Sequence, residues 1–267
     1  MPVTREDWSG ELATGNPAIP LVLKGLAGKS KGGGASSIPV FDEEEEKRWY
    51  LKAPNNPQGA ARLVAAEYIV SAAGRLIDAP VCEVRPMTIP DHFEGIIFPS
   101  NLTLAKGIGT ASQEVPDTVL NGQLLHRDRD DNRCRHVGVF ALFDWCWGDD
   151  PQWLNCSTED EKVYSHDHGY YFPPAGNDWT QAELLAQVDQ PHPLGHSADD
   201  LDLGEIARMG NALDAVTRAD LCAILRSVPQ EWGIPVDDLE VLGFFLERRA
   251  PAVATRMRAL HVTLSSP

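Results

Sequence analysis

The side chains of this sequence that could carry chemistry are aspartates in two polar loops. One loop reads HRDRDDNR and covers His126–Arg133, and the other reads GDDPQWLN and covers Gly148–Asn155. Phosphoryl transfer from a nucleotide needs an aspartate beside the attacking hydroxyl, magnesium held against the phosphates, and a cation on the phosphate oxygens. The spacing of neighbouring residues decides which loop could supply these groups.

The loop HRDRDDNR does not have this spacing. Protein kinases place a metal-binding asparagine about five residues after the catalytic aspartate, and a D-x-G aspartate follows on the next hairpin. Here Arg133 stands five residues after Asp128, and the next D-x-G, Asp167–Gly169, is 39 residues away. Because the segment is polar on every side, it is typical of a solvated loop or a helix start.

The loop GDDPQWLN has the spacing. Asp150 lies five residues before Asn155 and seventeen before Asp167 of the D-x-G triplet. Carboxylate and amide oxygens suit a hard cation, so the pattern predicts Asp150 as the catalytic base and Asn155 and Asp167 as ligands of Mg²⁺. A polar turn between two core elements is the alternative.

A lysine and a glutamate further upstream could complete the site. Lys52 ends the apolar stretch RWYLK, and Glu67 falls on the helix face of Leu63, Val70 and Ile77. A buried ammonium and a buried carboxylate each need a partner, so we expect an ion pair between Lys52 and Glu67 that aims the lysine at phosphate oxygens. A surface lysine and a helix-edge glutamate are the alternative.

The glycine-rich stretch KGGGASS precedes the lysine strand. Gly32, Gly33, Gly34 and Ser36 could let backbone N–H groups close over the phosphates of ATP. The stretch lacks the G-x-G-x-x-G spacing, so an ordinary flexible loop is an equal alternative.

The elements that must position these residues change in type along the chain. Residues 1–20 are predicted to be a loose arm. Residues 21–100 contain strand patterns at Leu21–Gly28, Arg48–Pro54, VCEVRPMTI and EGIIFPS, with an alanine-rich helix over Pro57–Arg75. From residue 101 to 267 the patterns are mainly helical, including an apolar helix over His136–Gly148. The expected fold class is α+β.

Composition limits the classes of function. The net charge of −16 disfavours direct binding to nucleic acid, which needs a basic face. No apolar run approaches 18 residues and no basic start leads into an apolar segment, so neither a membrane span nor a secretion signal is expected. Five scattered cysteines favour a reduced, cytoplasmic protein.

The sequence resembles the HipA-like kinases, and more narrowly their short single-chain relatives. YLKAPNNPQGAARLVAAEYIVSAAG resembles the lysine strand and glutamate helix of that family, VFALFDWCWGDDPQWLN its catalytic helix and loop, and SHDHGYYF its metal-binding segment. VPQEWGI and FLERRAPAV resemble its closing helices, so the resemblance covers roughly residues 20–255.

The resemblance implies a bilobal protein-kinase-like fold with a β-rich N-lobe at 21–100 and a helical C-lobe at 101–267. It also implies transfer of phosphate from ATP to serine or threonine of a protein substrate that the sequence does not identify. Lys52 would then contact phosphate and Glu67 would brace it. A regulatory serine is implied in the glycine loop, where Ser30, Ser36 and Ser37 stand.

Three positions depart from the family pattern. Gly148 stands where the family has asparagine, Pro151 where it has arginine, and Ala66 where asparagine often precedes the glutamate. These departures leave a pseudokinase, acting as a nucleotide- or partner-binding module, as the alternative. A metal-dependent phosphohydrolase is a further alternative, with Cys146, Cys156, His166 and His168 as candidate zinc ligands.

Overall fold

A computed structural model of the chain describes residues 3–28, 37–42, 47–55, 60–97, 103–174 and 178–266. The predicted phosphate-binding residues Gly32, Gly33, Gly34 and Ser36 lie outside the described residues, as does the acidic run at 43–46.

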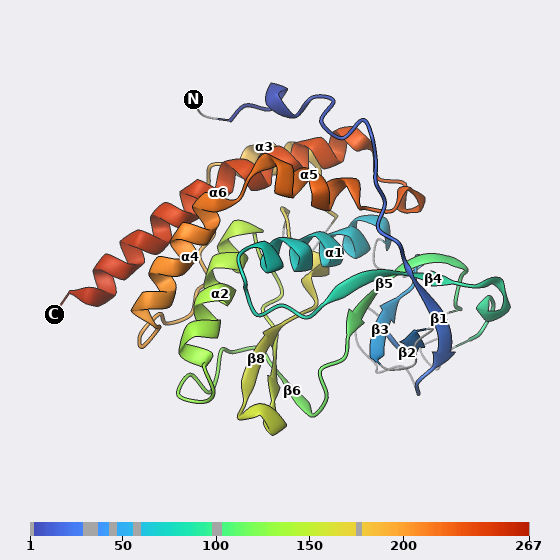
Figure 1. Cartoon of the computed structure of the whole chain (residues 1–267), viewed down its shortest axis with the longest axis horizontal. Helices are drawn as coiled ribbons and strands as arrows, with labels where there is room; N and C mark the ends of the chain where they lie inside the picture. Colours follow the sequence, from blue (N-terminus) through green and yellow to red (C-terminus); the bar gives the residue numbers. More distant parts are fainter. Residues whose placement is uncertain are drawn as a thin grey trace.

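Five strands of the first part close into a barrel in the order β1-β2-β3-β5-β4 (Figure 1). The strands are β1 (Leu21–Leu26), β2 (Ile38–Asp42), β3 (Arg48–Lys52), β4 (Val84–Ile89) and β5 (Gly107–Gln113). Alternate side chains point inward along a strand, and a buried cluster that includes Leu23, Val40, Trp49, Leu51 and Met87 fills the barrel. Lys52 follows directly on this core at the end of β3.

Strand β5 was not expected from the sequence. Helical structure was predicted to begin near residue 101, but Gly107–Gln113 pairs with both β3 and β4. Gly109 permits this close pairing, because a Cβ there would lie 2.5 Å from the Lys52 carbonyl oxygen. The strand expected at EGIIFPS is absent from its described residues, which make only an isolated bridge between Ile97 and Thr103.

Helix α1 (Ala60–Leu76) packs against the barrel and the helices of the second part. Its residues from Leu63 to Val70 are all buried, as expected for a central alanine-rich helix. The Thr110 hydroxyl on β5 donates to the Val64 carbonyl at 3.0 Å, and Arg62 pairs with Asp238 on another helix. The helix is therefore fixed on both sides, which fixes the direction of Glu67.

The second part is mainly helical. Its helices are α2 (Asn132–Trp145), α3 (Gln181–Gln187), α4 (Leu203–Ala215), α5 (Arg218–Arg226) and α6 (Val236–Ser265). Short 3₁₀ turns occur at Glu6–Trp8, Asp91–Phe93, Ser157–Glu159, His168–Tyr170 and Gln230–Trp232. Helix α5 begins with a reciprocal cap between Thr217 and Asp220, a common start signal. Helix α6 runs along the outer side of the helical part (Figure 1).

A small antiparallel sheet lies below α2 in Figure 1, in the order β6-β7-β8. Its strands are β6 (Thr118–Asn121), β7 (Trp153–Cys156) and β8 (Lys162–Ser165). Strand β7 follows the loop that carries Asp150, and β8 runs directly into Asp167. The hairpin β7-β8 therefore brings the two predicted acidic residues toward each other.

The sequence predicted a loose arm at residues 1–20, but residues 3–20 are packed against the helical part. Trp8 is fully buried against α6, where a Cβ on Gly243 would meet its ring at 2.2 Å. The Trp8 indole donates to Glu247 at 2.6 Å, and the Asn16 and Ala18 amides donate to the carbonyls of Arg226 and Ser227. The arm has little hydrophobic periodicity in its sequence, so the packing of Trp8 was not predicted.

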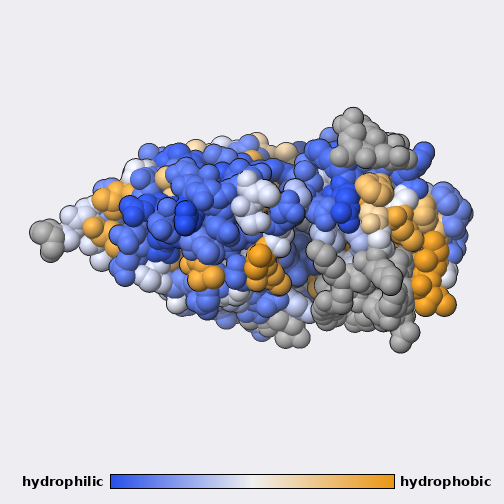
Figure 2. Space-filling view, turned by 90° about the horizontal axis from the view of Figure 1, so that it is seen from below, coloured by the Kyte–Doolittle hydropathy of each residue, from blue (hydrophilic) through white to orange (hydrophobic). Residues whose placement is uncertain are grey.

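The mixed α and β fold class is confirmed. The helices that the structure describes include none with the length and apolar character needed to cross a bilayer. Seen from below, hydrophilic residues cover most of the helical part, while apolar residues gather at the barrel end (Figure 2).

Candidate functional site

Lys52 lies between two carboxylates. Its Nζ contacts Oε1 of Glu67 and Oδ1 of Asp167, so the predicted ion pair with Glu67 is present. The side chain is 10% exposed, and burial works against its charge. The two carboxylates outweigh that effect and raise the pKa of Lys52 above its ordinary range. The ammonium is therefore charged and held in place at neutral pH.

Glu67 joins α1 to the segment that carries Asp167. Its Oε2 accepts a hydrogen bond of 3.0 Å from the backbone N–H of His168, while Oε1 contacts Lys52. Burial raises the pKa of Glu67 to about 7, although Lys52 opposes the shift. Gly169 makes the approach possible, because a Cβ there would lie 2.7 Å from Leu63 Cγ. The D-x-G triplet therefore needs its glycine for packing against α1.

Asp167 follows β8 with a left-handed backbone, at φ 57°. Its burial would raise the carboxyl pKa, but the charge of Lys52 overcomes this and lowers the pKa below the ordinary range. The side chain remains about a third exposed. Asp167 is therefore an ionised carboxylate that solvent or a ligand can still reach.

Asp150 and Asp167 are connected through Gln152. The Gln152 Nε2 donates to Asp150 Oδ2 at 2.8 Å and lies 3.2 Å from Asp167 Oδ2. Burial raises the pKa of Asp150, and the negative charges of Asp167 and Asp149 raise it further. The structure thus gathers Lys52, Glu67, Asp150 and Asp167, four residues singled out from the sequence.

Asn155 is not brought to this group. Its Oδ1 accepts from Asn121 Nδ2 at 2.8 Å, and its Nδ2 donates to the Glu161 carbonyl at 2.9 Å. Asn155 pairs with Val163 inside the β7-β8 hairpin and is fully buried, whereas Asp167 lies beyond the end of β8. Both ends of its carboxamide serve the small sheet instead.

Gln152 is the residue that sequence reasoning missed. Strand β7 begins at Trp153, so the loop that emerges from α2 is short and its carboxamide at Gln152 is the one beside Asp167. The available signal was the apolar start WL at Trp153, which marks Asn155 as a strand residue. The prediction of Asn155 relied on a fixed spacing of five residues after Asp150 and did not take this strand start into account.

The gathered side chains offer donors that suit a magnesium ion. Among the described residues, no group of three or more His, Cys, Asp or Glu side chains is arranged as a closed metal site. Mg²⁺ commonly uses one or two carboxylates together with substrate phosphates and water. The carboxylate of Asp167 fits such an open donor set, and a phosphate would supply the rest. The carboxamide oxygen of Gln152 would join the set once the amide turns, because its nitrogen faces both Asp150 and Asp167.

Two of the four candidate zinc ligands have other polar partners, while His166 Nε2 is buried without a hydrogen-bond partner among the residues that the structure describes. His168 Nε2 lies 2.8 Å from the Ser165 hydroxyl, and Cys156 Sγ lies 3.4 Å from the Pro116 carbonyl. Burial raises the pKa of the Cys146 thiol well above its ordinary value, which keeps it protonated. These residues form no common site in the described part of the chain.

The loop HRDRDDNR is an exposed turn that leads into α2 at Asn132, as predicted. Asp130 pairs with Arg135 at 3.0 Å, and Arg127 donates to the Ser197 carbonyl at 2.9 Å. Its charges therefore stabilise the start of α2 and its neighbours.

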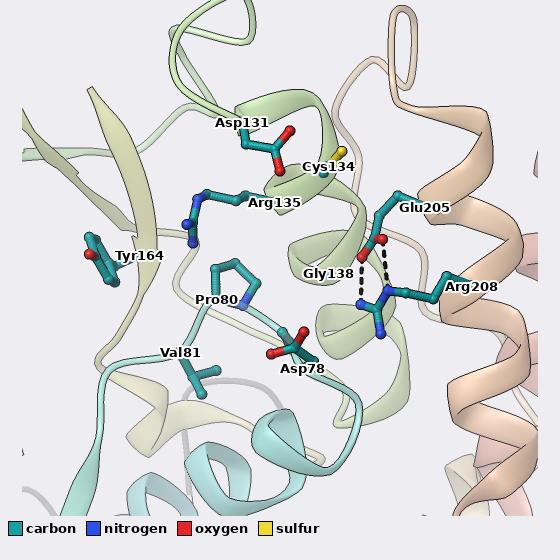
Figure 3. Close-up of a pocket in the computed structure, with 11 residues that line it drawn as sticks. Asp78, Pro80, Val81, Asp131, Cys134, Arg135, Gly138, Tyr164, Glu205 and Arg208 are labelled. Atoms are coloured by element: carbon teal, nitrogen blue, oxygen red, sulfur yellow. Dashed lines mark hydrogen bonds and ion pairs between the residues drawn. The ribbon is translucent and has the colours of Figure 1, made fainter. Parts of the chain in front are cut away.

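A separate polar pocket lies between the turn after α1, the start of α2, β8 and α4 (Figure 3). Its volume is about 390 Å³, and its lining includes Cys134, Arg135, Glu205 and Arg208. Arg208 Nε donates to Glu205 Oε2 at 2.7 Å, as drawn in Figure 3. Burial and Asp131 raise the pKa of Cys134 to about 12, so its thiol stays protonated. None of the four gathered residues lines this pocket.

The whole fold is similar to that of a known kinase. The crystal structure of the Helicobacter pylori proinflammatory kinase CtkA superimposes with a TM-score of 0.62 over 93% of this chain and 100% of that chain. The two sequences are 13% identical, so the likeness concerns the fold alone. No family model and no curated protein matches the sequence.

Proposed function

We propose that this protein transfers the γ-phosphate of ATP to a serine or threonine hydroxyl of a protein substrate, as a kinase of the HipA-like type. The observation that carries the proposal is the position of Lys52, which contacts Glu67 from α1 and Asp167 from the end of β8. A charged lysine anchored in this way is a ready partner for phosphate oxygens. The kinase-like fold supports the same conclusion.

Each gathered residue has a role in the proposal. Lys52 binds phosphate oxygens, and Glu67 holds the lysine in that direction. Asp150 orients the attacking hydroxyl and accepts its proton. Asp167 would hold Mg²⁺, which neutralises phosphate charge when bound. Gln152 lies beside Asp167 through its amide nitrogen, and on metal binding it would turn its carboxamide oxygen into the role expected of Asn155.

The division of the chain is proposed accordingly. Residues 1–20 form an arm and residues 21–100 belong to an N-lobe, to which β5 (Gly107–Gln113) is added because it completes the barrel. The C-lobe, expected from residue 101, therefore begins after β5 and runs to residue 267. The glycine stretch with Gly32, Gly33, Gly34 and Ser36 would cover the phosphates of ATP bound between the lobes. A regulatory phosphorylation at Ser30, Ser36 or Ser37 remains part of the proposal.

The setting of the enzyme is also a proposal. A cytoplasmic location, with neither direct binding to nucleic acid nor attachment to a membrane, accords with the net charge of −16 and the five free cysteines.

A pseudokinase is the second candidate, because Asn155 is withdrawn into the small sheet. The two candidates differ in whether phosphate is transferred. Incubation with ATP and Mg²⁺, alone and with cell lysate, followed by phosphopeptide mass spectrometry, tests the proposal. Transfer that is lost in Asp167→Ala supports the kinase. Nucleotide binding in calorimetry without transfer to any protein supports the pseudokinase, and no nucleotide binding contradicts both.

A further inference from the structure

The backbone around Asp150 adopts conformations that need external support. Trp147 and Asp150 have φ angles of 56° and 51°, in the left-handed region that residues other than glycine rarely occupy. Gly148 lies between them, and a Cβ there would come within 2.3 Å of Phe143. Its amide donates to the Phe143 carbonyl at 2.7 Å. The loop is thus wrapped tightly against the last turn of α2.

His192 grips this loop from the segment between α3 and α4. Its ring stacks on Trp147 with centroids 4.2 Å apart and on Phe143 with centroids 5.4 Å apart. Its Nε2 lies 2.8 Å from the Gly148 carbonyl oxygen. Because a carbonyl only accepts, Nε2 carries the hydrogen in this contact. The imidazole therefore holds the residue just before Asp149 and Asp150 by one directional bond and two ring faces.

The support of His192 is itself rigid. Its backbone N–H donates to Asp144 Oδ1 at 3.0 Å, and Arg256 Nε lies 2.6 Å from Asp144 Oδ2. Arg249, which is 1% exposed, also pairs with Asp144 and lies over the Trp147 ring at 5.0 Å. The buried end of α2 and helix α6 therefore anchor the residue that anchors the loop.

We propose that His192 is a positioning residue that holds the Gly148 carbonyl and thereby sets Asp150 for the transfer step. The proposal rests on the proposed kinase function. Gly148 is buried, so its carbonyl needs a partner within the protein. Without the Nε2 donor, the loop can relax toward ordinary backbone angles and move Asp150 away from the attacking hydroxyl. Misplacement by about 1 Å can reduce turnover on the order of a hundredfold.

A matched pair of substitutions tests the hydrogen bond. In His192→Gln the side-chain amide can reach the Gly148 carbonyl, whereas in His192→Asn the amide is one methylene shorter and falls short. His192→Phe keeps a ring for stacking but has no donor. His92→Gln, at an exposed site on the barrel side, is the control. The full chain is used for every variant, with turnover, KM for ATP and ATP affinity measured alongside hydrogen exchange of peptides covering residues 147–153.

The expected result is a fall in kcat of about tenfold to a hundredfold in the Asn and Phe variants. ATP affinity should stay within about threefold, because Lys52 and Asp167 are untouched, and exchange over residues 147–153 should accelerate. The Gln variant should recover most of the turnover and protection. Equal behaviour of folded Gln and Asn variants would overturn the proposal, as would a Phe variant with normal turnover and exchange.

Hydrogen exchange also separates this proposal from the proposed function. If the native protein transfers no phosphate, the kinase proposal fails, but the exchange comparison of the Gln and Asn variants still tests the grip of His192 on the loop. Faster exchange in the Asn variant alone supports the grip. Equal exchange rates in the two variants would contradict the role of His192 in holding the loop.

Discussion

The backbone N–H of His168 donates a 3.0 Å hydrogen bond to Oε2 of Glu67, two residues whose positions in the sequence differ by 101. The same glutamate contacts Lys52 through Oε1. One side chain of α1 therefore sets both the lysine of the barrel and the backbone that carries Asp167, so the three residues should behave as a unit.

Substitutions of Lys52 or Glu67 should destabilise the protein and weaken ATP binding. Lys52→Met leaves buried Glu67 without its counter-charge, so it should lower the free energy of unfolding by roughly 3–5 kcal/mol. Glu67→Gln should lower it by less, because Lys52 keeps Asp167 as a counter-charge. The double variant should lose clearly less than the sum, in urea unfolding and in ATP affinity. Lys47→Ala is the control, because Lys47 and Glu83 are 50% and 37% exposed and such pairs contribute little. Additive losses would contradict the coupling.

Asp150 should be required for phosphate transfer but not for ATP binding, because a base acts on the incoming hydroxyl. Asp150→Asn should remove transfer and leave ATP affinity within about threefold by calorimetry. Asp128→Asn, in the exposed HRDRDDNR turn, is the matched control and should keep native activity. Loss of activity in a folded Asp128→Asn variant would return the catalytic role to that turn.

The rate of transfer should fall on acidification at a higher pH than for an unperturbed aspartate. Burial and the charges of Asp167 and Asp149 raise the pKa of Asp150, and only its ionised form can accept a proton. Asp149→Asn removes one of those charges, so it should move the acid limb of the pH–rate profile downward. Single-turnover rates between about pH 4 and 8 measure this, with circular dichroism to confirm folding. An unmoved limb would exclude Asp150 as the titrating group.

Gln152 rather than Asn155 should govern the magnesium requirement. Gln152→Ala should raise the Mg²⁺ concentration needed for half-maximal ATP binding by about tenfold, in line with the effect of losing a metal-supporting group. Asn155→Ala should instead lower the unfolding temperature, because it removes one of the two donors to the Glu161 carbonyl and the acceptor of Asn121 Nδ2. Calorimetry at varied Mg²⁺ separates the two. A magnesium effect confined to Asn155→Ala would reinstate the spacing deduced from sequence.

Acid should destabilise the fold through His136. This side chain is fully buried, and burial followed by the charge of Arg127 lowers its pKa to about 3. An unfolded histidine binds its proton near pH 6.5, so from there down to about 3 only the unfolded state is protonated. Stability should therefore fall with decreasing pH in this window, by about 1.4 kcal/mol per pH unit for this residue. The free energy of unfolding, measured with urea at several pH values, should depend less steeply on pH in His136→Gln by that amount. An equal pH dependence in the variant and the native protein would contradict the assignment.

The sequence by itself determined the parts of the site that have a local signature. Lys52 ends an apolar strand and Glu67 lies on an apolar helix stripe, so burial dictated that they pair, and the pair is present. The apolar helix before GDDPQWLN and the strand before D-x-G likewise predicted that Asp150 and Asp167 would follow core elements. The exposed HRDRDDNR turn was predicted from its unbroken polarity. In each case one short pattern was sufficient.

Only the tertiary structure decided which residues meet across elements. Asn155 pairs with Val163 inside the small sheet, whereas Gln152 stands before the strand and lies beside Asp167. Each position along a strand moves a side chain by about 3.3 Å, so the start of β7 decides which carboxamide lies near Asp167. Trp8 packs against Gly243 on α6, and β5 closes the barrel because Gly109 lets it approach the backbone of Lys52 closely. His192 reaches Gly148 from 44 positions away in the sequence. Such contacts depend on packing between distant segments, which no local pattern of residues encodes.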